Sequence, residues 1–518
     1  MPDSGVVQHT AETTPGAAAD PVRAAAARRP DAPALIAHDT TLTWAELDSR
    51  VDTAAHRLIT TVRAGGGAEA AGGGTVPPRV AIVLPDSLDF AVTYFAVLRA
   101  GLVAVPLNPA YTDDEREHAV VDSGAALVVT GADPAGPADG PAVALPSVRP
   151  GAPAVLLYTS GTGGRPKGAI LSHAALVANH TQLARLDPPL LGPDDVVLLT
   201  VPLFHAYGLN TGLGAVAHHA ACGVLVDRFD PETSLALIAR RRVTVTIGVP
   251  SMYAAWSRRP EAGEALASVR TAVCGAAPLD AADAARFTAL TGKTIIVGYG
   301  LTETAPVLTT TAAGTLGKIG SIGRPLPGVE LLLRTADGEE LWRDGVAAGP
   351  DDRDELDLAL QTSPGTDPGE IVVRGANLFD GYWPDGHGGP DAGGWWGTGD
   401  IAYADGDGDL FLVDRIGELI LVNGFNVYPA EIERVLDSHP GVAEAAVVGV
   451  PSADTGATPR AYVVPTGQPA PTPAELLRHC AGRLARFKLP TSIELVEELP
   501  HSAIGKVRKT MLRTEDLA

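Results

Sequence analysis

Cysteine is scarce in this sequence. The 518 residues contain only Cys222, Cys274 and Cys480, and no two of them form a C-x-x-C pair. This spacing excludes a disulfide framework and a cysteine-rich zinc site. No apolar run is long enough to cross a membrane as a helix, and the N-terminus lacks the basic start and apolar core of a signal peptide. We therefore expect a cytoplasmic protein without a transmembrane segment.

Basic residues are also few relative to acidic ones. Lys and Arg number 39 against 61 Asp and Glu, which gives a net charge of −22. A surface this acidic repels nucleic acid and anionic membranes, so neither is expected as a partner. A local basic pocket for a phosphorylated small molecule remains compatible with this charge.

The chain does have a globular composition, with 45% hydrophobic residues, and it is too long for one compact core. Short apolar runs at residues 79–85 and 102–109 alternate with helical patterns. The same rhythm returns near residues 196–205, 243–250 and 294–300. Such alternation indicates parallel sheets covered by helices, in which ligands bind at the carboxyl ends of the strands.

From about residue 315 the pattern changes to short strands separated by glycine turns, as in a small β-barrel. The predicted fold is α/β, with a large N-terminal domain of stacked, mostly parallel αβ sheets plus this small β-barrel, and a separate small α+β C-terminal domain. We expect a loose tail over 1–19, the N-terminal domain over 20–413 (barrel part about 315–413) and the C-terminal domain over 418–518. The acidic stretch within 336–368 is interpreted as a solvated loop.

The segment 158–168 reads YTSGTGGRPKG and follows a short apolar run. Glycines let backbone N–H groups approach a ligand closely. Hydroxyl groups donate hydrogen bonds to phosphate oxygens, and a lysine adds positive charge. We interpret this segment as a polyphosphate-binding loop. It is not a Walker A motif, because Lys167 stands between Pro166 and Gly168, and this excludes a P-loop ATPase.

Three other segments place polar side chains where they can serve a nucleotide. GYGLTET, at 298–304, offers a ring for a purine in Tyr299, a hydroxyl for a phosphate in Thr302, and a carboxylate for Mg²⁺ in Glu303. In GWWGTGD, Asp400 follows a glycine turn, where its carboxylate can accept from both hydroxyls of a ribose. LPHSAIGKVRK carries Lys506 near the C-terminus.

Together and in this order, YTSGTGGRPKG, GYGLTET, GWWGTGD, VDRIGELILVNGFNVYPAEIE and the terminal GK resemble the adenylate-forming (AMP-binding) superfamily. This superfamily includes acyl-CoA synthetases such as fatty-acid-CoA ligases, aryl-CoA ligases, firefly-type luciferases and the adenylation domains of peptide synthetases. The resemblance extends over roughly residues 20–513. It implies an acid-thiol ligase (acyl-CoA synthetase, AMP-forming) that uses ATP, Mg²⁺ and CoA, or the phosphopantetheine of a carrier protein.

The resemblance implies roles for individual residues. Lys506, Thr302, Glu303 and His205 would be catalytic, with Lys506 bridging the substrate carboxylate and the α-phosphate. Glu303 and Thr162 would bind the metal. The residues implied to bind ATP are Thr159, Ser160, Gly161, Thr162, Gly163, Lys167, Gly275, Ala276, Ala277, Pro278, Tyr299, Gly300, Asp400 and Arg415. Ala276 departs from the G-G-x-P pattern that is commoner in the superfamily.

The resemblance also implies that the C-terminal domain is mobile and rotates about a hinge at 414–417 between adenylation and thiol transfer. Gly417 stands where the superfamily usually has Asp or Lys, which leaves the hinge plausible because glycine permits wide backbone excursions. Gly424, in VNGFNVYP, would leave room for the pantetheine arm in a thiol tunnel.

The acid itself is expected to be neutral apart from its carboxylate. Tyr207, Gly208, Gly212, Gly248 and Val307 would form the walls of the acyl pocket, and they are small or mostly apolar. No aspartate is placed to pair with an amino group. The leading prediction is a medium- or long-chain fatty acid, since PLFHAYGLN resembles fatty-acid ligases, and the same segment also resembles aryl (hydroxycinnamate) CoA ligases.

Alternative readings concern the acceptor and the activity. Transfer to an acyl carrier protein instead of CoA stays open, because both present a pantetheine arm, and Arg486 and Lys488 could serve either partner. A catalytically inactive homologue that senses or scaffolds is disfavoured, because Lys167, Glu303, Asp400 and Lys506 are all present.

Overall fold

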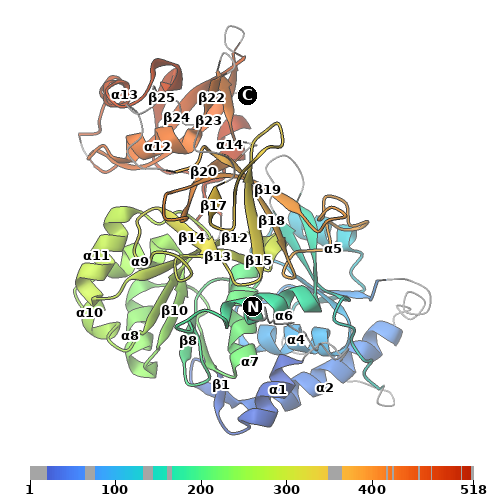
Figure 1. Cartoon of the computed structure of the whole chain (residues 1–518). Helices are drawn as coiled ribbons and strands as arrows, with labels where there is room; N and C mark the ends of the chain where they lie inside the picture. The colour runs from blue at the N-terminus through green and yellow to red at the C-terminus, as the bar shows by residue number, and fades with distance from the viewer. Residues whose placement is uncertain are drawn as a thin grey trace, which may run out of the picture.

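The structure is a computed structural model that describes residues 20–64, 76–131, 144–159, 166–347, 365–415, 418–422, 425–452, 456–467, 469–502 and 505–514. Figure 1 shows a large body that holds most of the chain and a smaller body, in orange and red, packed on one end of it. The predicted fold class is confirmed, because mixed α/β sheets form the large body and a separate sheet with helices forms the C-terminal one.

The first sheet has five strands in the order β5-β3-β4-β6-β7. β3 to β6 pair in parallel and β7 pairs antiparallel with β6. β3 and β4 are almost wholly buried, as is usual for parallel strands covered on both faces. The strands are β3 (Arg79–Ile82), β4 (Val103–Pro106), β5 (Leu127–Val129), β6 (Pro153–Thr159) and β7 (Lys167–Ser172).

The second sheet is longer, and its first half is built from parallel strands. β1, β9, β8, β10, β11 and β12 run parallel, β2 pairs antiparallel with β1 at the edge, and β13 turns back along β12. The strands are β1 (Pro33–Ala37), β2 (Thr40–Thr43), β8 (Val196–Leu199), β9 (Cys222–Leu225), β10 (Val245–Gly248), β11 (Thr271–Cys274), β12 (Ile295–Gly300) and β13 (Val307–Thr310).

Helices cover these sheets, and their starts follow from local sequence. Thr43 and Thr112 form capping boxes with Glu46 and Glu115 and so begin α2 and α5. The helices are α1 (Pro21–Arg28), α2 (Trp44–Val62), α4 (Leu88–Arg99), α5 (Asp113–Ser123), α6 (His173–Leu183), the π-helix η2 (Tyr207–Gly214), α7 (Ala215–His219), α8 (Pro231–Arg241), α9 (Pro250–Ser257), α10 (Ala262–Ala265), α11 (Ala281–Thr291) and the 3₁₀ turn η3 (Thr302–Thr304).

An antiparallel unit continues the second sheet where a small β-barrel was expected. The pairings of its described strands follow one open order, β17-β16-β15-β18-β19-β20-β14, and join the large sheet through β13. The strands are β14 (Ser321–Pro325), β15 (Val329–Arg334), β16 (Glu340–Arg343), β17 (Val346–Ala347), β18 (Gly369–Gly375), β19 (Trp396–Ala404) and β20 (Leu410–Arg415). The acidic residues Asp351, Asp352, Asp354, Glu355 and Asp357 lie outside the described residues.

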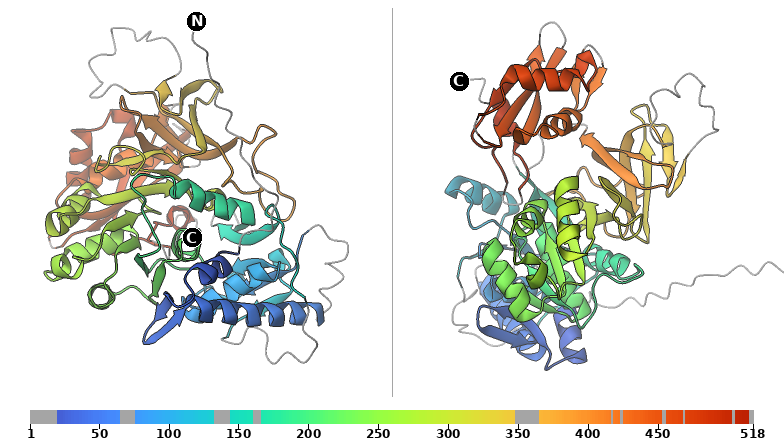
Figure 2. Two further views of the ribbon diagram at one scale, coloured as in Figure 1. Left: turned by 60° about the horizontal axis from the view of Figure 1, so that its bottom comes forward. Right: turned by 90° about the vertical axis from the view of Figure 1, so that its left-hand side faces the viewer.

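The C-terminal body has its own sheet and its own buried core, which includes Ile432, Val447 and Leu476. Its strands are β21 (Ile420–Val422), β22 (Phe425–Val427), β23 (Val442–Ser452), β24 (Gly456–Pro465) and β25 (Ser492–Leu495). Its helices are α12 (Pro429–Asp437), α13 (Pro473–Ala481), the 3₁₀ turn η5 (Arg486–Lys488) and α14 (Lys509–Thr514). The right-hand view of Figure 2 shows this body beside the antiparallel unit and above the rest of the large body.

Backbone and side-chain hydrogen bonds tie the start of the C-terminal body to β20, the strand that leads into it. The Asp414 carboxylate, at the end of β20, accepts a hydrogen bond from the Ala430 backbone N–H at 3.0 Å. Within the C-terminal body, Lys509 forms ion pairs with Glu418 and Glu433, each at 2.8 Å.

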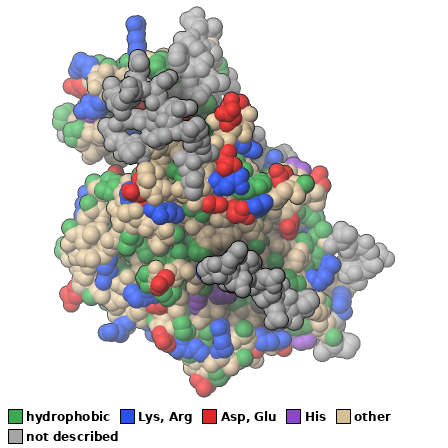
Figure 3. Space-filling view, in the orientation of Figure 1, with side chains coloured by type: hydrophobic (Ala, Val, Ile, Leu, Met, Phe, Trp, Pro, Cys, Tyr) green, Lys and Arg blue, Asp and Glu red, His purple; other side chains and the backbone are tan. Residues whose placement is uncertain are grey.

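On the face in Figure 3, acidic and basic side chains are interspersed. Among the described helices, none is long and apolar enough to cross a membrane.

Candidate active site

A single cavity of about 3180 Å³ lies at the carboxyl ends of the parallel strands and extends between the two bodies. It collects side chains from segments that are far apart in the sequence. The predicted site residues that line it are Thr159, His205, Tyr207, Gly275, Ala276, Ala277, Pro278, Tyr299, Gly300, Thr302, Glu303, Val307, Asp400, Arg415 and Lys506.

Glu303 is fixed by a neighbour on a distant segment. It lies in η3, directly after β12, with 7% of its surface exposed. The Tyr382 hydroxyl donates to Glu303 Oε1 at 2.7 Å, and the Phe379 backbone N–H donates to the Glu303 carbonyl at 2.9 Å. One carboxylate oxygen is thus occupied and the group is oriented at the cavity wall. A single carboxylate beside phosphate-binding groups suits Mg²⁺, which usually takes one or two carboxylates plus substrate oxygens and water.

The Asp400 carboxylate, on β19, binds side chains from two other strands, β12 and β20. Its Oδ2 accepts from the Tyr299 hydroxyl at 2.6 Å, and its Oδ1 pairs with Arg415 Nε at 2.7 Å. Asp400 is 4% exposed, and burial and Asp400 itself raise the pKa of Tyr299, which keeps the phenol protonated as the donor. Each carboxylate oxygen retains one lone pair, enough to accept from a diol.

Lys506 is the one described cationic side chain that the C-terminal body places beside these acidic groups. Burial and Arg415 lower the pKa of the Lys506 ammonium, whereas Asp400, Glu303 and Glu418 raise it. Lys506 keeps solvent-accessible surface because it lies in the open cavity, although protein surrounds it. Burial, together with the positive charge of Lys506, lowers the pKa of His205 to about 4, so His205 is neutral at pH 7.

The described ends of the predicted phosphate-binding loop lie on neighbouring strands. Thr159 closes β6, Lys167 opens β7, and the two residues pair directly. Lys167 Nζ lies 5.5 Å from the centre of the Tyr382 ring, a cation–π contact. Lys167 does not itself line the cavity, but Tyr382 does. Ser160, Gly161, Thr162 and Gly163 lie outside the described residues.

The segment 275–278 follows β11 and forms a flat wall of the cavity. A Cβ at Gly275 would come within 3.2 Å of the Gly298 carbonyl oxygen and the Tyr207 ring, so glycine permits the close packing found there. Ala276 adopts a positive φ of 70°. The backbone at this position therefore accommodates alanine where the superfamily more often has glycine, and the cavity stays open.

Two of the five residues predicted to form the acyl pocket line the cavity, and the other three, all glycines, lie behind its wall. Tyr207 and Val307 line the cavity, but among the described lining residues Gly208, Gly212 and Gly248 do not occur. A Cβ at Gly208 would lie 2.3 Å from the Pro202 carbonyl oxygen, and one at Gly212 would lie 3.1 Å from Leu199. A Cβ at Gly248 would meet the Tyr253 ring at 3.2 Å. These glycines permit close packing behind the wall.

One wall of the cavity follows one face of the continuous η2–α7 helix. Tyr207, Thr211, Ala215 and His219 are spaced four residues apart and all line the cavity, as expected for one helical stripe. The opposite wall comes from the sheet, with Val245 and Ile247 of β10 and Ile295 and Val297 of β12. The cavity therefore runs from the carboxyl ends of the strands down to their amino ends.

The sequence reasoning missed Tyr382, Thr211, Ala215 and His219. The helical stripe could have been found by continuing from Tyr207 in steps of four along YGLNTGLGAVAHH. Tyr382 carries no comparable signal, because its role depends on a contact with Glu303 across 79 residues.

The predicted hinge residue Gly417 and tunnel residue Gly424 both lie outside the described residues. Of the two basic residues considered for the acceptor, Lys488 is already paired with Glu431 at 2.7 Å. Arg486 is exposed on η5.

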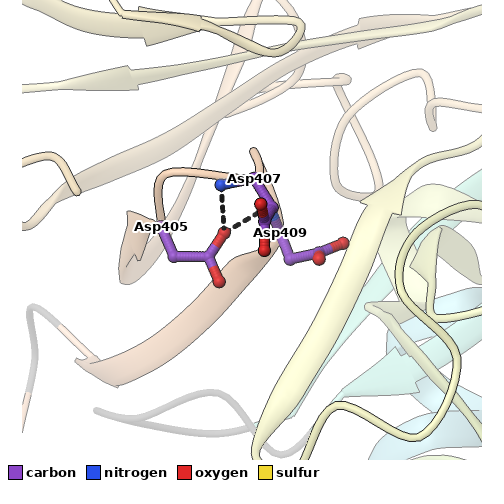
Figure 4. Close-up of side chains that lie close together, drawn as sticks. All are labelled: Asp405, Asp407 and Asp409. Carbon is purple, nitrogen blue, oxygen red and sulfur yellow. Dashed lines mark hydrogen bonds between the residues drawn. The ribbon is translucent and has the colours of Figure 1, made fainter. Parts of the chain in front are cut away.

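Three aspartates on the turn between β19 and β20 have the spacing of a metal site, but a lysine side chain lies among them. Figure 4 shows Asp405, Asp407 and Asp409 on the turn between β19 and β20, with the Asp407 and Asp409 backbone N–H groups donating to Asp405. Lys318 Nζ forms ion pairs with all three carboxylates, at 2.5, 2.8 and 2.9 Å, and Arg324 pairs with Asp409. The ammonium of Lys318 takes the position a cation would need, so the cluster is structural.

The fold and the cavity define an enzyme class in which a nucleotide and a carboxylic acid meet between a large α/β body and a small C-terminal one. The profile of the AMP-binding enzyme family matches residues 22–383, and that of its C-terminal domain matches residues 431–506. The chain belongs to the AMP-binding enzyme family.

Curated relatives and solved structures resemble the chain over nearly its whole length. A feruloyl-CoA synthase of an Amycolatopsis species is 36% identical, over 93% of this chain and 96% of the relative. A long-chain-fatty-acid–CoA ligase of Yersinia pestis is 32% identical, over 85% of each chain. The crystal structure of ATP-bound MatB from Rhodopseudomonas palustris superimposes with a TM-score of 0.78 at 31% identity, covering 94% of this chain and 96% of that one.

Proposed function

We propose that the protein activates a medium- or long-chain fatty acid. The acid carboxylate attacks the α-phosphorus of ATP to give an acyl-adenylate and pyrophosphate. The thiol of CoA then attacks the acyl carbon, and AMP leaves. The observation that carries the choice of acid is the long stripe of Tyr207, Thr211, Ala215 and His219 along one wall of the cavity.

The arrangement of charges supports the adenylation step. The carboxylate and the triphosphate are both anionic, so their approach requires cations at the reacting atoms. Lys506 reaches the cavity from the C-terminal body, beside Asp400 and Glu303, where its ammonium can contact both the acid and the α-phosphate. Preorganised charge of this kind contributes about 10²–10³ in rate for each donor. Thr302 lines the cavity next to Glu303 and is placed to donate to a phosphate oxygen.

Glu303, oriented by Tyr382, would hold Mg²⁺, and the ion would offset charge on the phosphate oxygens. Asp400 would accept from the ribose hydroxyls while its bonds to Tyr299 and Arg415 keep it in place. Tyr299 and the wall at 275–278 would flank the adenine. His205 lines the same cavity near Lys506 and, because it is neutral, adds no second positive charge there.

The depth of the cavity supports a long acid. Tyr207 and His219 are twelve positions apart on one helical face, which corresponds to at most about 18 Å at the α-helical rise of about 1.5 Å per residue, since the π-helical part is shorter. Much of the lining along this path is apolar, including Leu183, Leu190, Leu191, Val245 and Ile295. An extended alkyl chain fills such a path and buries its surface at about 25 cal/mol per Å².

An aryl-propenoic acid is the second candidate. The relative with 36% identity is a feruloyl-CoA synthase. Thr211, one turn below Tyr207, has a buried Oγ1 without a hydrogen-bond partner in the described structure, at a depth that an aromatic ring would reach. A buried hydroxyl without a partner is costly, so a hydroxylated ring has something to gain there.

The test is pyrophosphate release with ATP and a panel of acids. The panel contains straight-chain acids of increasing length and the hydroxycinnamates, each assayed with CoA and with a holo acyl carrier protein as acceptor. The proposal expects the highest kcat/KM for a straight-chain acid with CoA. A maximum on hydroxycinnamates would replace it by the second candidate, and turnover with the carrier protein alone would replace CoA as the acceptor.

A further inference from the structure

The far end of the acyl cavity is polar, although much of its wall is apolar. We call this end the cavity floor and define it by His180, His219, Val245 and Ile295, which line the cavity at the ends of α6 and α7 and at the amino ends of β10 and β12. A floor made to receive only the methyl end of an alkyl chain would need no imidazole. The presence of two histidines at this end of the cavity therefore needs a physical explanation.

The two histidines differ in their partners. Asn210 forms a side-chain hydrogen bond with His180, and the His180 ring stacks on His218 at 5.1 Å. His219 packs edge-on against His218 at 5.1 Å, but its ring nitrogens have no hydrogen-bond partner anywhere in the described part of the chain. His219 therefore faces the cavity with its donor and its acceptor both unused.

His219 offers hydrogen bonds and not a charge. Burial, His218 and Arg28 lower its pKa to about 4, while Asp195 acts in the opposite direction, so the imidazole is neutral at pH 7. A neutral imidazole carries one N–H donor and one nitrogen acceptor. It suits a hydroxyl or carbonyl group and gives no charge compensation to a second carboxylate. An alkyl terminus pressed against it would leave both groups without partners, at a cost.

We propose that the cavity floor is a hydrogen-bonding subsite for a neutral polar group at the far end of the acid, and that His219 is its specificity-determining residue. The chemical class is a long acid with a terminal or near-terminal hydroxyl or oxo group. This inference rests on the proposed function, because it takes the path below Tyr207 as the acyl site.

The experiment compares matched acids in three proteins. Pyrophosphate release is measured for alkanoic acids of eight to sixteen carbons and for their ω-hydroxy counterparts. The proteins are the wild type, His219→Leu, and His218→Leu as the matched control, since His218 contacts both histidines but does not line the cavity. At the length that reaches the floor, we expect the wild type to prefer the ω-hydroxy acid about tenfold in kcat/KM. His219→Leu should lose or reverse that preference, and His218→Leu should keep it.

Equal ratios in the wild type and His219→Leu would overturn the subsite while leaving the proposed fatty-acid activity intact. Turnover of hydroxycinnamates with no straight-chain acid accepted would overturn both, and the two failures are therefore distinguishable. If His219→Leu does not fold, the wild-type series decides alone. The ω-hydroxy preference must then peak at one chain length, and a preference for the alkyl acid at every length would overturn the inference.

Discussion

The large body and the C-terminal body hold their site residues in different ways. In the large body, Glu303 and Asp400 are almost fully buried, and each is held by hydrogen bonds from side chains of other segments, Tyr382 for Glu303 and Tyr299 and Arg415 for Asp400. In the C-terminal body, Lys506 lies on a segment between β25 and α14, where its backbone N–H donates to the Ser502 hydroxyl at 3.1 Å and its carbonyl accepts from the Ser502 N–H at 2.8 Å. The groups proposed to bind the nucleotide are thus held in place by side-chain contacts, whereas the group proposed to act in only one half-reaction is carried by a separate body.

The largest expected effect comes from removing the group on the separate body. Lys506→Ala should lower adenylate formation by about 10² or more, because a cation is lost at the α-phosphate. Thiol transfer from a supplied acyl-adenylate should survive, since the proposed rotation moves Lys506 away for that step. The two half-reactions are measured separately, by pyrophosphate release and by thioester formation. Equal loss of rate in both half-reactions would contradict the idea that Lys506 acts in adenylation alone.

A smaller effect is expected from breaking a rigid contact of the large body. Asp400→Ala should weaken ATP binding by about 1.5–3 kcal/mol, the range for hydrogen bonds to a charged group. Binding is measured by isothermal titration without acid or CoA. Asp407→Ala is the control, because Asp407 is exposed and outside the cavity. An unchanged affinity would show that Asp400 only supports Tyr299 and Arg415.

The cluster around Lys318 tests whether rigidity of the large body is separable from its site. Burial alone would raise the pKa of Asp409, but Thr315 and Lys318 lower it to about 2. A depressed carboxylate pKa stabilises the fold above the unfolded value near 3.8 and loses that contribution as pH falls toward 2. Lys318→Met should cost about 1–2 kcal/mol at pH 7, and the difference from wild type should shrink between pH 4 and 2.

Urea unfolding at several pH values measures this difference, and Lys293→Met serves as the charge-matched control. A constant difference down to pH 2 would contradict the role of Asp409. Adenylation by Lys318→Met at neutral pH should stay near the wild-type rate, because Lys318 pairs with the three aspartates and not with Glu303 or Asp400.

The smallest effect is expected from the Tyr382 hydroxyl, which donates to the carboxylate proposed to bind Mg²⁺. Tyr382→Phe keeps the ring beneath Lys167 and removes the bond to Glu303. Loss of a group that orients a metal ligand should raise the Mg²⁺ concentration needed for half-maximal ATP binding by about tenfold, with little change at saturating Mg²⁺. A titration of ATP binding against Mg²⁺ measures this. An unchanged Mg²⁺ dependence would show that Glu303 is oriented by its backbone alone.

Much of the fold and the chemistry follows from the sequence. The alternation of apolar runs with helical patterns predicted the parallel sheets, because burial on both faces requires continuous apolar strands. The segments YTSGTGGRPKG and GYGLTET, with Lys506, indicated the family because their residue types are those that phosphates and Mg²⁺ require. Most predicted site residues that the structure describes do line one cavity. The roles assigned to all of these site residues stay predictions, and Ser160, Thr162, Gly417 and Gly424 also lie outside the described residues.

Only the tertiary structure decided which residues line the proposed acyl region of the cavity. Gly208, Gly212 and Gly248 are small because backbone and side chains pack against them from behind, which local sequence does not show. Tyr382 bonds to Glu303 across 79 residues, and Lys318 occupies a cluster that by spacing alone resembles a metal site. The sequence determined the periodicity and the reactive groups, which depend on neighbours along the chain. The depth of the cavity and the partners of its polar groups depend on packing between distant segments, and only the folded chain fixes those.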